Sequence, residues 1–527
     1  MEEKVNNEII WKSLNIIAKS SVIVFIGIAI SKILGYTYRI IIARYFGPEV
    51  YGLFTLGLIV FGWLIAFSIF GLNSGLLRYI SLYRGKKEFK KISFVYKRVV
   101  VITLTLSIFL GLFLFLSADF ISLYLFKEPN LGIFLKIFSI GVPLSVMFNI
   151  SLAVMLAYEK IREHSFFFNI LQNITRLGIF ILLIFFGVRE NSVPLSYILS
   201  IAISLAGAYI FFKYTLTEIF VKSKLNKNEK SKITKEVFSY SWPFLFSGII
   251  VSFFSWVDSF FIGYFLGAEE VGIYNAGVPI AALVMITTEL FINMFFPLVT
   301  REYAKGRVEV IKQISKQVSK WIFIINLPLL ILIVLFPGAF INLLFGNEYL
   351  LAVNSLRFLA IGMFFSSIFE VSNRLISMTG RSKIIMVDIS IMVLVNALLN
   401  YLFIPRYGIN GAAFATMISL ILLNVLFLIQ AKYYMSIVPV RRKMLNIFLL
   451  SLIPAFILLY LKYKINNINF FILILLITLF LAIYLFLIVI TKSFDKNDFT
   501  TIKSLIERYG LLKFFKRFNL QKPIKTT

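Results

Sequence analysis

The chain has 527 residues, of which 60% are hydrophobic and 15% are charged, and its mean hydropathy is +0.91. A soluble domain is nearer about half apolar and about a quarter charged, so the composition indicates a protein whose main solvent is lipid. The chain has no cysteine, which excludes disulfides, Cys-ligated zinc, iron–sulfur clusters and cysteine nucleophiles.

Apolar blocks long enough to cross a bilayer recur along the whole sequence. A helical span needs roughly 20 mostly apolar residues, and Pro or Gly within such a block is tolerated because neighbouring helices satisfy the freed backbone groups. We therefore predict an all-α polytopic membrane protein with about fourteen transmembrane helices, near 18–44, 51–83, 95–117, 133–157, 165–187, 193–215, 238–266, 271–300, 318–336, 351–378, 384–404, 409–431, 444–461 and 468–491.

Basic residues are unevenly distributed among the connections between these spans. The connections after even-numbered spans, together with both termini, hold 39 of the 53 basic residues, whereas the opposite connections hold six. Because loops rich in Lys and Arg face the cytoplasm, we predict a multi-pass protein of the cytoplasmic membrane with both termini inside. The net charge of +28 is then mainly a topology signal, and nucleic-acid binding is the weaker explanation for it.

Two segments match without gaps at an offset of 220 residues, 43–60 and 263–280, each at the outer turn between the first and second spans of its half. Identical residues coincide at Gly47/Gly267, Glu49/Glu269, Gly52/Gly272 and Gly57/Gly277. Six spans separate the copies, so both halves enter the membrane in the same direction, as a parallel repeat with binding expected between the halves. The predicted organisation is an N-terminal six-helix lobe (1–222), a basic cytoplasmic linker (223–237), a C-terminal six-helix lobe (238–440), helices 13 and 14 (441–491) and a cytoplasmic amphipathic basic tail (492–527) that lies on anionic lipid.

Charged residues inside the predicted spans are mostly cations. Such charges are costly and usually face a cavity or a partner, and an excess of cations suggests an anionic ligand. The basic ones are Lys19, Lys32, Arg39, Arg78, Lys136, Arg176, Arg357 and Arg374, and the acidic ones are Asp258, Glu289, Glu370 and Asp388.

The stretch 31–86, which contains ARYFGPEVYG at 43–52, resembles the opening of polysaccharide-biosynthesis flippases of the O-antigen transporter type. The stretch 373–420, which contains FIPRYGINGAAFATM, resembles the C-terminal half of the same family, a branch of the multidrug/oligosaccharidyl-lipid/polysaccharide exporter superfamily. The resemblance implies a monomeric, non-enzymatic flippase without a cofactor, which carries a polyprenyl- or dolichyl-(pyro)phosphate-linked oligosaccharide to the outer leaflet by alternating access. Its partners would be that lipid-linked sugar and the membrane lipids.

The lipid II flippases of the superfamily carry a Ser-Arg-x-x-Gly segment followed by an Arg-Asp pair that matters for the substrate. The matching segment here is Ser31-Lys32-Ile33-Leu34-Gly35, and Tyr38-Arg39 replaces the pair. The cationic character survives while the acid is lost, which favours a lipid-linked sugar other than lipid II.

The candidate substrate-binding residues are Lys32, Arg39, Arg78, Arg176 and Arg374. Lys32 and Arg39 are seven residues apart, about two helical turns, so they share a face that could bind phosphate; Arg39 could instead extend to the outer surface. Arg78 could meet phosphate on entry or anchor in headgroups. Arg176 could contact sugar together with its polar neighbours.

Asp258 and Glu370 are the candidates for coupling or ion pairing. Asp258 could pair with a cation of the first span in one conformation, form a static salt bridge between lobes, or bind a coupling proton or sodium ion. Glu370 and Arg374 are four residues apart, for which an ion pair within one helix is the first expectation. Coupling to sodium, protons or the membrane potential stays open, whereas ATP drive is not expected because there is no Gly-Lys-Ser/Thr loop.

Two other functions remain as alternatives. A multidrug antiporter of the same superfamily would share the fold, but we would expect an acid-rich cavity for cationic drugs. A membrane glycosyltransferase or polymerase would usually need a large outer loop and catalytic acids, and the outer connections here are short with no Asp-x-Asp pair.

Overall fold

The computed structural model describes residues 2–221, 225–465 and 470–491, and side chains from Gly27 onward within these ranges. Every regular element in this part of the chain is helical. The amphipathic helix predicted in the tail after residue 492 lies outside the described residues.

The N-terminal half comprises α1 (Glu2–Ile69), α2 (Leu72–Gly85), α3 (Phe89–Phe120), α4 (Leu131–Ala157), α5 (Ile161–Ser165), α6 (Gln172–Phe185) and α7 (Ser192–Thr215). Short π-helical turns, Ile121–Leu125 and Phe166–Leu171, extend α3 and join α5 to α6, and a 3₁₀ turn, Thr217–Phe220, follows α7.

The C-terminal half comprises α8 (Lys227–Phe265), α9 (Ala268–Ala282), α10 (Ile286–Ala304), α11 (Val308–Leu335), α12 (Pro337–Leu344), α13 (Val353–Met378) and α14 (Ser382–Met435), followed by α15 (Arg442–Lys464) and α16 (Phe470–Ile490). Leu283–Met285 and Asn347–Ala352 are 3₁₀ turns. Because α8 begins at Lys227, most of the predicted linker 223–237 forms its first turns.

The predicted number of spans is confirmed once two breaks are counted. Twelve helical stretches in the described residues are long and apolar enough to cross a membrane. Two of them hold two predicted spans each, because α1 is kinked at Gly47 (φ 81°) and α14 at Gly408 (φ 58°). Positive φ values of this kind suit glycine, and Pro48 is tolerated at the first position of the helix that restarts there.

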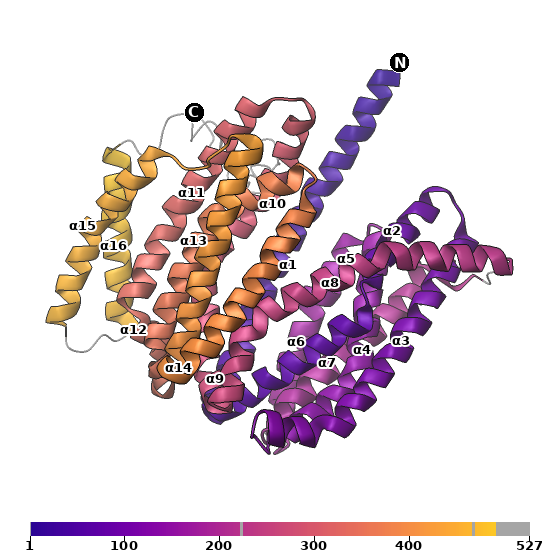
Figure 1. The fold of residues 1–527 in the computed structure, drawn as a ribbon, viewed down its shortest axis with the longest axis horizontal. Coiled ribbons are helices and arrows are strands. Elements are labelled where there is room, and N and C mark those ends of the chain that lie inside the picture. The colour runs from indigo at the N-terminus through magenta and orange to yellow at the C-terminus, as the bar shows by residue number, and fades with distance from the viewer. Residues whose placement is uncertain (1, 222–224, 466–469, 492–527) are drawn as a thin grey trace, which may run out of the picture.

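The helices form two lobes that meet at the foot of the view in Figure 1 and diverge toward its top. One lobe holds α2 to α7, the other holds α9 to α14, and the long helices α1 and α8 pass between them (Figure 1). Helices α15 and α16 pack beside α11 through Leu332, Leu458 and Leu476. The predicted fold class, two lobes plus two C-terminal helices, is therefore confirmed.

The repeat is visible at the point where the two halves touch. A Cβ atom on Gly52 would lie 1.7 Å from the Ala268 carbonyl oxygen, and one on Gly272 would lie 1.9 Å from the Pro48 carbonyl oxygen. Pro48 and Ala268 are themselves 220 residues apart, as are the two glycines. The two sides of this one backbone crossing are thus equivalent, with the halves exchanged, which is the arrangement that a parallel repeat predicts.

Candidate substrate and coupling sites

Several polar contacts close the lobes at the Gly47/Gly267 end. The Glu128 carboxylate accepts a hydrogen bond from the Ala268 backbone N–H at 2.7 Å, and Glu348, 220 residues further on, lies beside Gly47 in the same way. The Tyr349 hydroxyl donates to the Ala43 carbonyl at 3.0 Å.

Arg44 adds a charged contact at this end. Its guanidinium donates to the carbonyl oxygens of Asn342, Leu343 and Leu344 at 2.6–3.1 Å. These carbonyls end α12, where a cation is stabilised by the helix dipole. The predicted outer end of the protein is therefore closed in this conformation.

The first span contacts both lobes through different faces. Toward the N-terminal lobe, the Tyr38 hydroxyl donates to the Val193 carbonyl at 2.8 Å, and Asn173 donates to the Ser31 hydroxyl at 3.0 Å. Toward the C-terminal lobe, the Lys32 ammonium lies 2.9 and 3.0 Å from the two carboxylate oxygens of Glu289 in α10.

This ion pair shows the partner of the first-span cation in this conformation. Lys32 pairs with Glu289 and Asp258 faces α9 and α14, so pairing of Asp258 with a first-span cation stays a prediction for another conformation. The Lys32 and Glu289 side chains are 32% and 51% exposed, so an anionic ligand could reach Lys32 and compete with Glu289 for it.

Arg176 and Arg39 lie around Tyr38. The Arg176 guanidinium stacks over the Tyr197 ring at 4.1 Å and lies 5.8 Å from the Tyr38 ring centre. Its Nε atom is buried and has no hydrogen-bond partner among the described residues. Arg39 interacts electrostatically with Tyr38 and lies within hydrogen-bonding reach of the Tyr51 hydroxyl. The structure thus brings two of the five predicted substrate cations together.

Arg78 and Arg374 lie apart from this group. Arg78 is exposed on α2, with its guanidinium 4.1 Å from the centre of the Tyr240 ring. Arg374 forms the expected ion pair with Glu370 within α13, at 2.9 Å.

The remaining charges inside the spans have partners within their own lobe. Lys136 pairs with Asp119 at 2.7 Å, and Gln430 donates to Asp388 at 2.7 Å. Arg357 donates to the Val334 carbonyl at 3.2 Å. The side chain of Lys19 is not among those described.

Asp258 is the centre of a polar cluster built from three helices. Its carboxylate accepts hydrogen bonds from the Tyr274 hydroxyl at 2.7 Å, from the Asn400 amide at 2.9 Å and from the Thr416 hydroxyl. Asn396 contacts the Asn400 amide at 3.1 Å. One carboxylate and several neutral oxygens are the kind of group that can hold a proton or a small hard cation.

One acceptor in this cluster is left over. The Asn400 Oδ1 atom is buried and has no hydrogen-bond partner among the described residues. Such an atom is expected to have a role, because an unpaired buried acceptor is costly. Sequence reasoning identified Asp258 but missed its neutral partners. The signal available was Asn396-x-x-x-Asn400, two amides one turn apart in an otherwise apolar block.

Comparisons with known proteins agree with this architecture. Residues 17–301 match the family described as "Polysaccharide biosynthesis protein", and residues 243–402 match the MatE family. A putative O-antigen transporter of Shigella flexneri is 26% identical over 77% of this chain and 95% of its own length. A probable low-salt glycan biosynthesis flippase, Agl15 of Haloferax volcanii, is 26% identical over 52% of this chain and 55% of its own length. The solved lipid II flippase MurJ, in an inward closed conformation, has the same fold with a TM-score of 0.71, at 16% identity, over 89% of this chain and 98% of that one.

Proposed function

Because this chain belongs to the polysaccharide biosynthesis protein family, we propose that it is a flippase for a lipid-linked oligosaccharide. The substrate would be a polyprenyl- or dolichyl-(pyro)phosphate-linked sugar, moved from the cytoplasmic to the outer leaflet of the cytoplasmic membrane. The named relatives are transporters and flippases rather than catalysts, so the expectation that the chain is not an enzyme is confirmed at the level of the family.

The observation that carries the proposal is the Lys32–Glu289 pair between the lobes. Unassisted flipping fails because phosphate and hydroxyl groups would enter hydrocarbon unpaired. A phosphate could replace Glu289 at Lys32, since both side chains of that pair are accessible. Arg39 and Arg176 lie near Tyr38 on the same span and its neighbour α6, so they would meet the rest of the head group.

The direction of loading follows from which end is closed. The lobes are joined at the Gly47/Gly267 end by Arg44, Glu128 and Tyr349, and they diverge toward the other end (Figure 1). By the positive-inside argument the diverging end is cytoplasmic. This conformation would then receive the substrate from the cytoplasmic leaflet, while the lipid tail stays in the bilayer.

Asp258 is the proposed coupling site. A sodium ion or proton would neutralise the Asp258 carboxylate, which accepts hydrogen bonds from neutral donors of α9 and α14. Occupancy would therefore change how tightly α8, α9 and α14 are held together, which is the link that alternating access requires.

A multidrug antiporter is the second candidate, because the MatE match at residues 243–402 covers Asp258, Tyr274 and Asn400, though not Thr416. The cations of the first span favour the sugar-lipid substrate over a cationic drug. Transport of a lipid-linked sugar and of a lipophilic cation by the same reconstituted protein would separate the two candidates.

The direct test is delivery of lipid-linked sugar to the outer face, with membrane abundance measured in parallel. We expect Lys32→Ala to reduce delivery by about 10- to 100-fold, the value of a lost charged hydrogen bond. Lys32→Arg should retain part of the activity, because the charge survives although guanidinium and ammonium bind phosphate differently. Lys136→Ala is the matched control, since Lys136 also forms an accessible intramembrane ion pair.

The double variant Lys32→Ala, Glu289→Gln separates ligand binding from structure. If Lys32 serves only to neutralise Glu289, removing both charges should restore delivery. If Lys32 binds phosphate, the double variant should stay as inactive as Lys32→Ala. Normal delivery by Lys32→Ala alone would disprove the proposed phosphate contact.

A further inference from the structure

The first stretch of α8 lies across the ends of neighbouring helices rather than along them. Figure 1 shows it crossing the lobe near α2 and α3, on the right of the view, before α8 turns down between the lobes. Its inner face is buried at Ile233, Val237 and Ser241, and a Cβ on Gly75 of α2 would lie 2.1 Å from the Ser241 hydroxyl. The outer face carries Lys232, Lys235 and Ser239, which are exposed. The stretch is thus an amphipathic helix seated firmly on α2.

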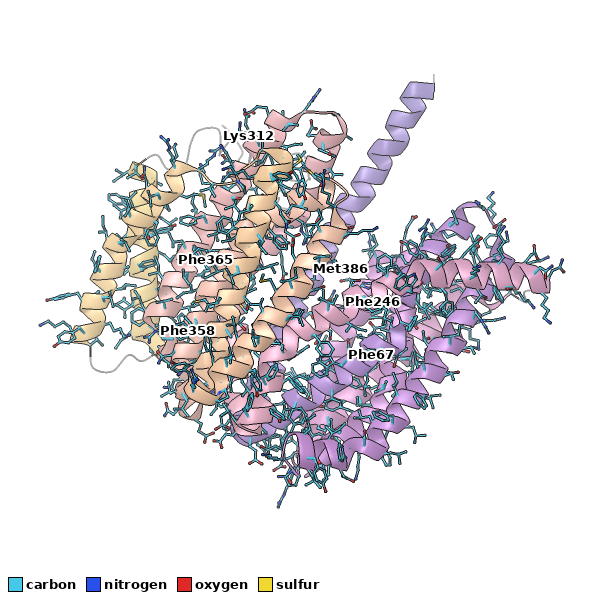
Figure 2. The ribbon with its side chains drawn as sticks, in the orientation of Figure 1. Phe67, Phe246, Lys312, Phe358, Phe365 and Met386 are labelled. Atoms are coloured by element: carbon cyan, nitrogen blue, oxygen red, sulfur yellow. The ribbon has the colours of Figure 1, made fainter. Side chains whose placement is uncertain are left out.

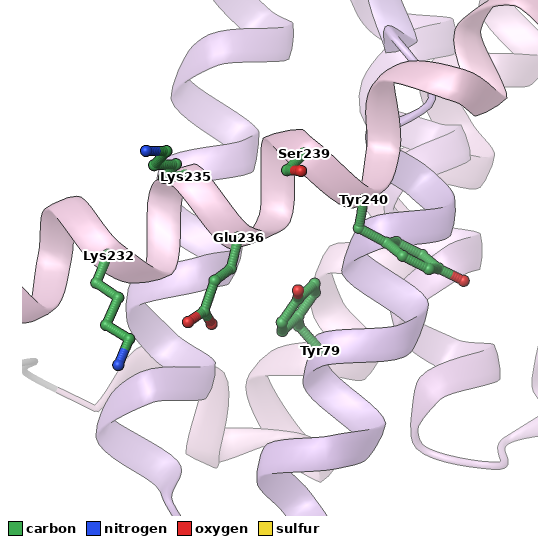
Figure 3. Close-up of a pocket in the computed structure, with 6 residues that line it drawn as sticks. All are labelled: Tyr79, Lys232, Lys235, Glu236, Ser239 and Tyr240. Atoms are coloured by element: carbon green, nitrogen blue, oxygen red, sulfur yellow. The ribbon is translucent and has the colours of Figure 1, made fainter.

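A cavity of about 550 Å³ opens between this stretch and α2. It is lined by Tyr79 of α2 and by Lys232, Lys235, Glu236, Ser239 and Tyr240 of α8. Figure 3 shows Tyr79 facing Glu236, with Lys232 beside it and Lys235 on the other side of α8.

The charges around this cavity are predominantly positive. Lys232 and Lys235 line the cavity. The Arg78 guanidinium, which stacks over the Tyr240 ring at 4.1 Å, borders the same space. The lining thus contains two lysines and one carboxylate, Glu236, with Arg78 next to Tyr240. The hydroxyls of Ser239 and the tyrosines add neutral donors. This combination suits a phosphate group, which takes several N–H and O–H donors at once.

The residues that follow indicate the depth of the cavity in the membrane. Trp242, Phe244 and Phe246 are 53%, 39% and 50% exposed, and Figure 2 places Phe246 where α8 turns down between the lobes. Exposed aromatic residues directly after lysines are typical of the boundary between headgroups and hydrocarbon. The cavity therefore opens at headgroup level, in the leaflet on the basic side.

We propose that this cavity binds the phosphate-bearing headgroup of an anionic membrane lipid. The lipid would hold α8 to α2 at the point where α8 bends, so that the leaflet itself supports one lobe. None of the residues placed around Lys32 or Asp258 lines the cavity.

The test is binding of phosphatidylglycerol, relative to phosphatidylcholine, by the purified full-length chain in detergent, followed by native mass spectrometry. We expect Lys232→Gln, Lys235→Gln to reduce the preference for the anionic lipid by about 10- to 100-fold, the value of a lost hydrogen bond to the charged phosphate. The matched control is Lys227→Gln, Lys230→Gln, which removes the same charge from the same helix outside the cavity. Its effect should be about threefold or less.

Equal losses in the two double variants would show diffuse attraction to the helix and would overturn the proposal. Glycerol 3-phosphate distinguishes a lipid from a soluble ligand with the same chemistry. We expect it to compete only weakly, since it cannot insert beside the aromatic residues. Saturation by glycerol 3-phosphate at the affinity of the lipid would assign the cavity to a soluble phosphate and refute the lipid assignment. Circular dichroism of each variant checks that the helices are retained.

Discussion

The crossing of Gly52 and Gly272 predicts how the closed outer end can be opened by a single methyl group. A Cβ on Gly52 would lie 1.7 Å from the Ala268 carbonyl oxygen and 2.6 Å from its carbon. Both atoms belong to the backbone, so no side-chain rotation relieves the overlap. In Gly52→Ala the two helices must separate by more than about 1 Å, and strain of this kind costs about 1–3 kcal/mol.

That cost applies only while the lobes are closed at this end. The gain in helix propensity from Gly to Ala is the same in every conformation and cancels. The equilibrium between this conformation and one that is open at the outer end should therefore shift by about 5- to 150-fold toward the open one. Gly62→Ala is the matched control, because it lies on the same helix and a Cβ there meets nothing within 4 Å.

The chain has no cysteine, which makes a spin-label measurement direct. Labels at Tyr124 and Leu351, which are 73% and 71% exposed, flank the closing glutamates on the two lobes. Double electron–electron resonance should show a longer distance in Gly52→Ala and not in Gly62→Ala.

The repeat makes the prediction stricter. Gly272→Ala should have a similar effect, since its Cβ would lie 1.9 Å from the Pro48 carbonyl oxygen. The double variant should shift the equilibrium by less than the sum, because separating the lobes relieves both overlaps at once. Unchanged distances in Gly52→Ala, or effects that add fully, would refute the idea that this crossing is one contact specific to the closed state.

Two further predictions concern coupling and topology. Asp258→Asn should remove the dependence of transport on a sodium or pH gradient, because the amide cannot change charge. The measurement is the initial transport rate with and without each gradient. A gradient response equal to that of the wild type would exclude Asp258 as the coupling group. A single cysteine introduced at Lys127 should react with an impermeant reagent added from outside, whereas one at Ser231 should react only after permeabilisation. Reversed labelling would overturn the orientation inferred from the basic loops.

The number and order of the spans could be predicted from sequence because lipid imposes a length on each apolar block. The sequence also predicted a turn at Gly47-Pro48, and the structure has a sharp change of direction there, between two helices that follow each other directly. A single glycine with φ 81° absorbs the change of direction, and Pro48 restarts the helix without needing an acceptor, because proline has no backbone N–H. Gly408 does the same in α14. Local signals predict where direction changes, whereas the size of the change depends on packing.

The partner of Lys32 could not be predicted in this way. The repeat points to Asp258 as one candidate, because it lies in the seventh span, the repeat equivalent of the first. The pseudo-twofold relation, however, packs the first span of one half against the second span of the other, as the Lys32–Glu289 pair across 257 residues shows. Which side chain reaches Lys32 then depends on how each helix is rotated about its own axis. In apolar blocks with isolated charges, the sequence has no periodic pattern that indicates this rotation.

The same relation explains why the repeat could predict the geometry of the site but not its chemistry. The equivalent crossing, between the second span and the seventh, carries Ile69 and Ser252 at the positions of Glu289 and Lys32. Close by, Trp63 and Phe253 stack with ring centroids 4.3 Å apart and planes inclined by 3°. One crossing is therefore charged and its counterpart is aromatic and apolar, although the backbones repeat. With two equal cationic sites, a phosphate could bind at either crossing. A single charged crossing instead fixes the side of the lobes that a head group must approach.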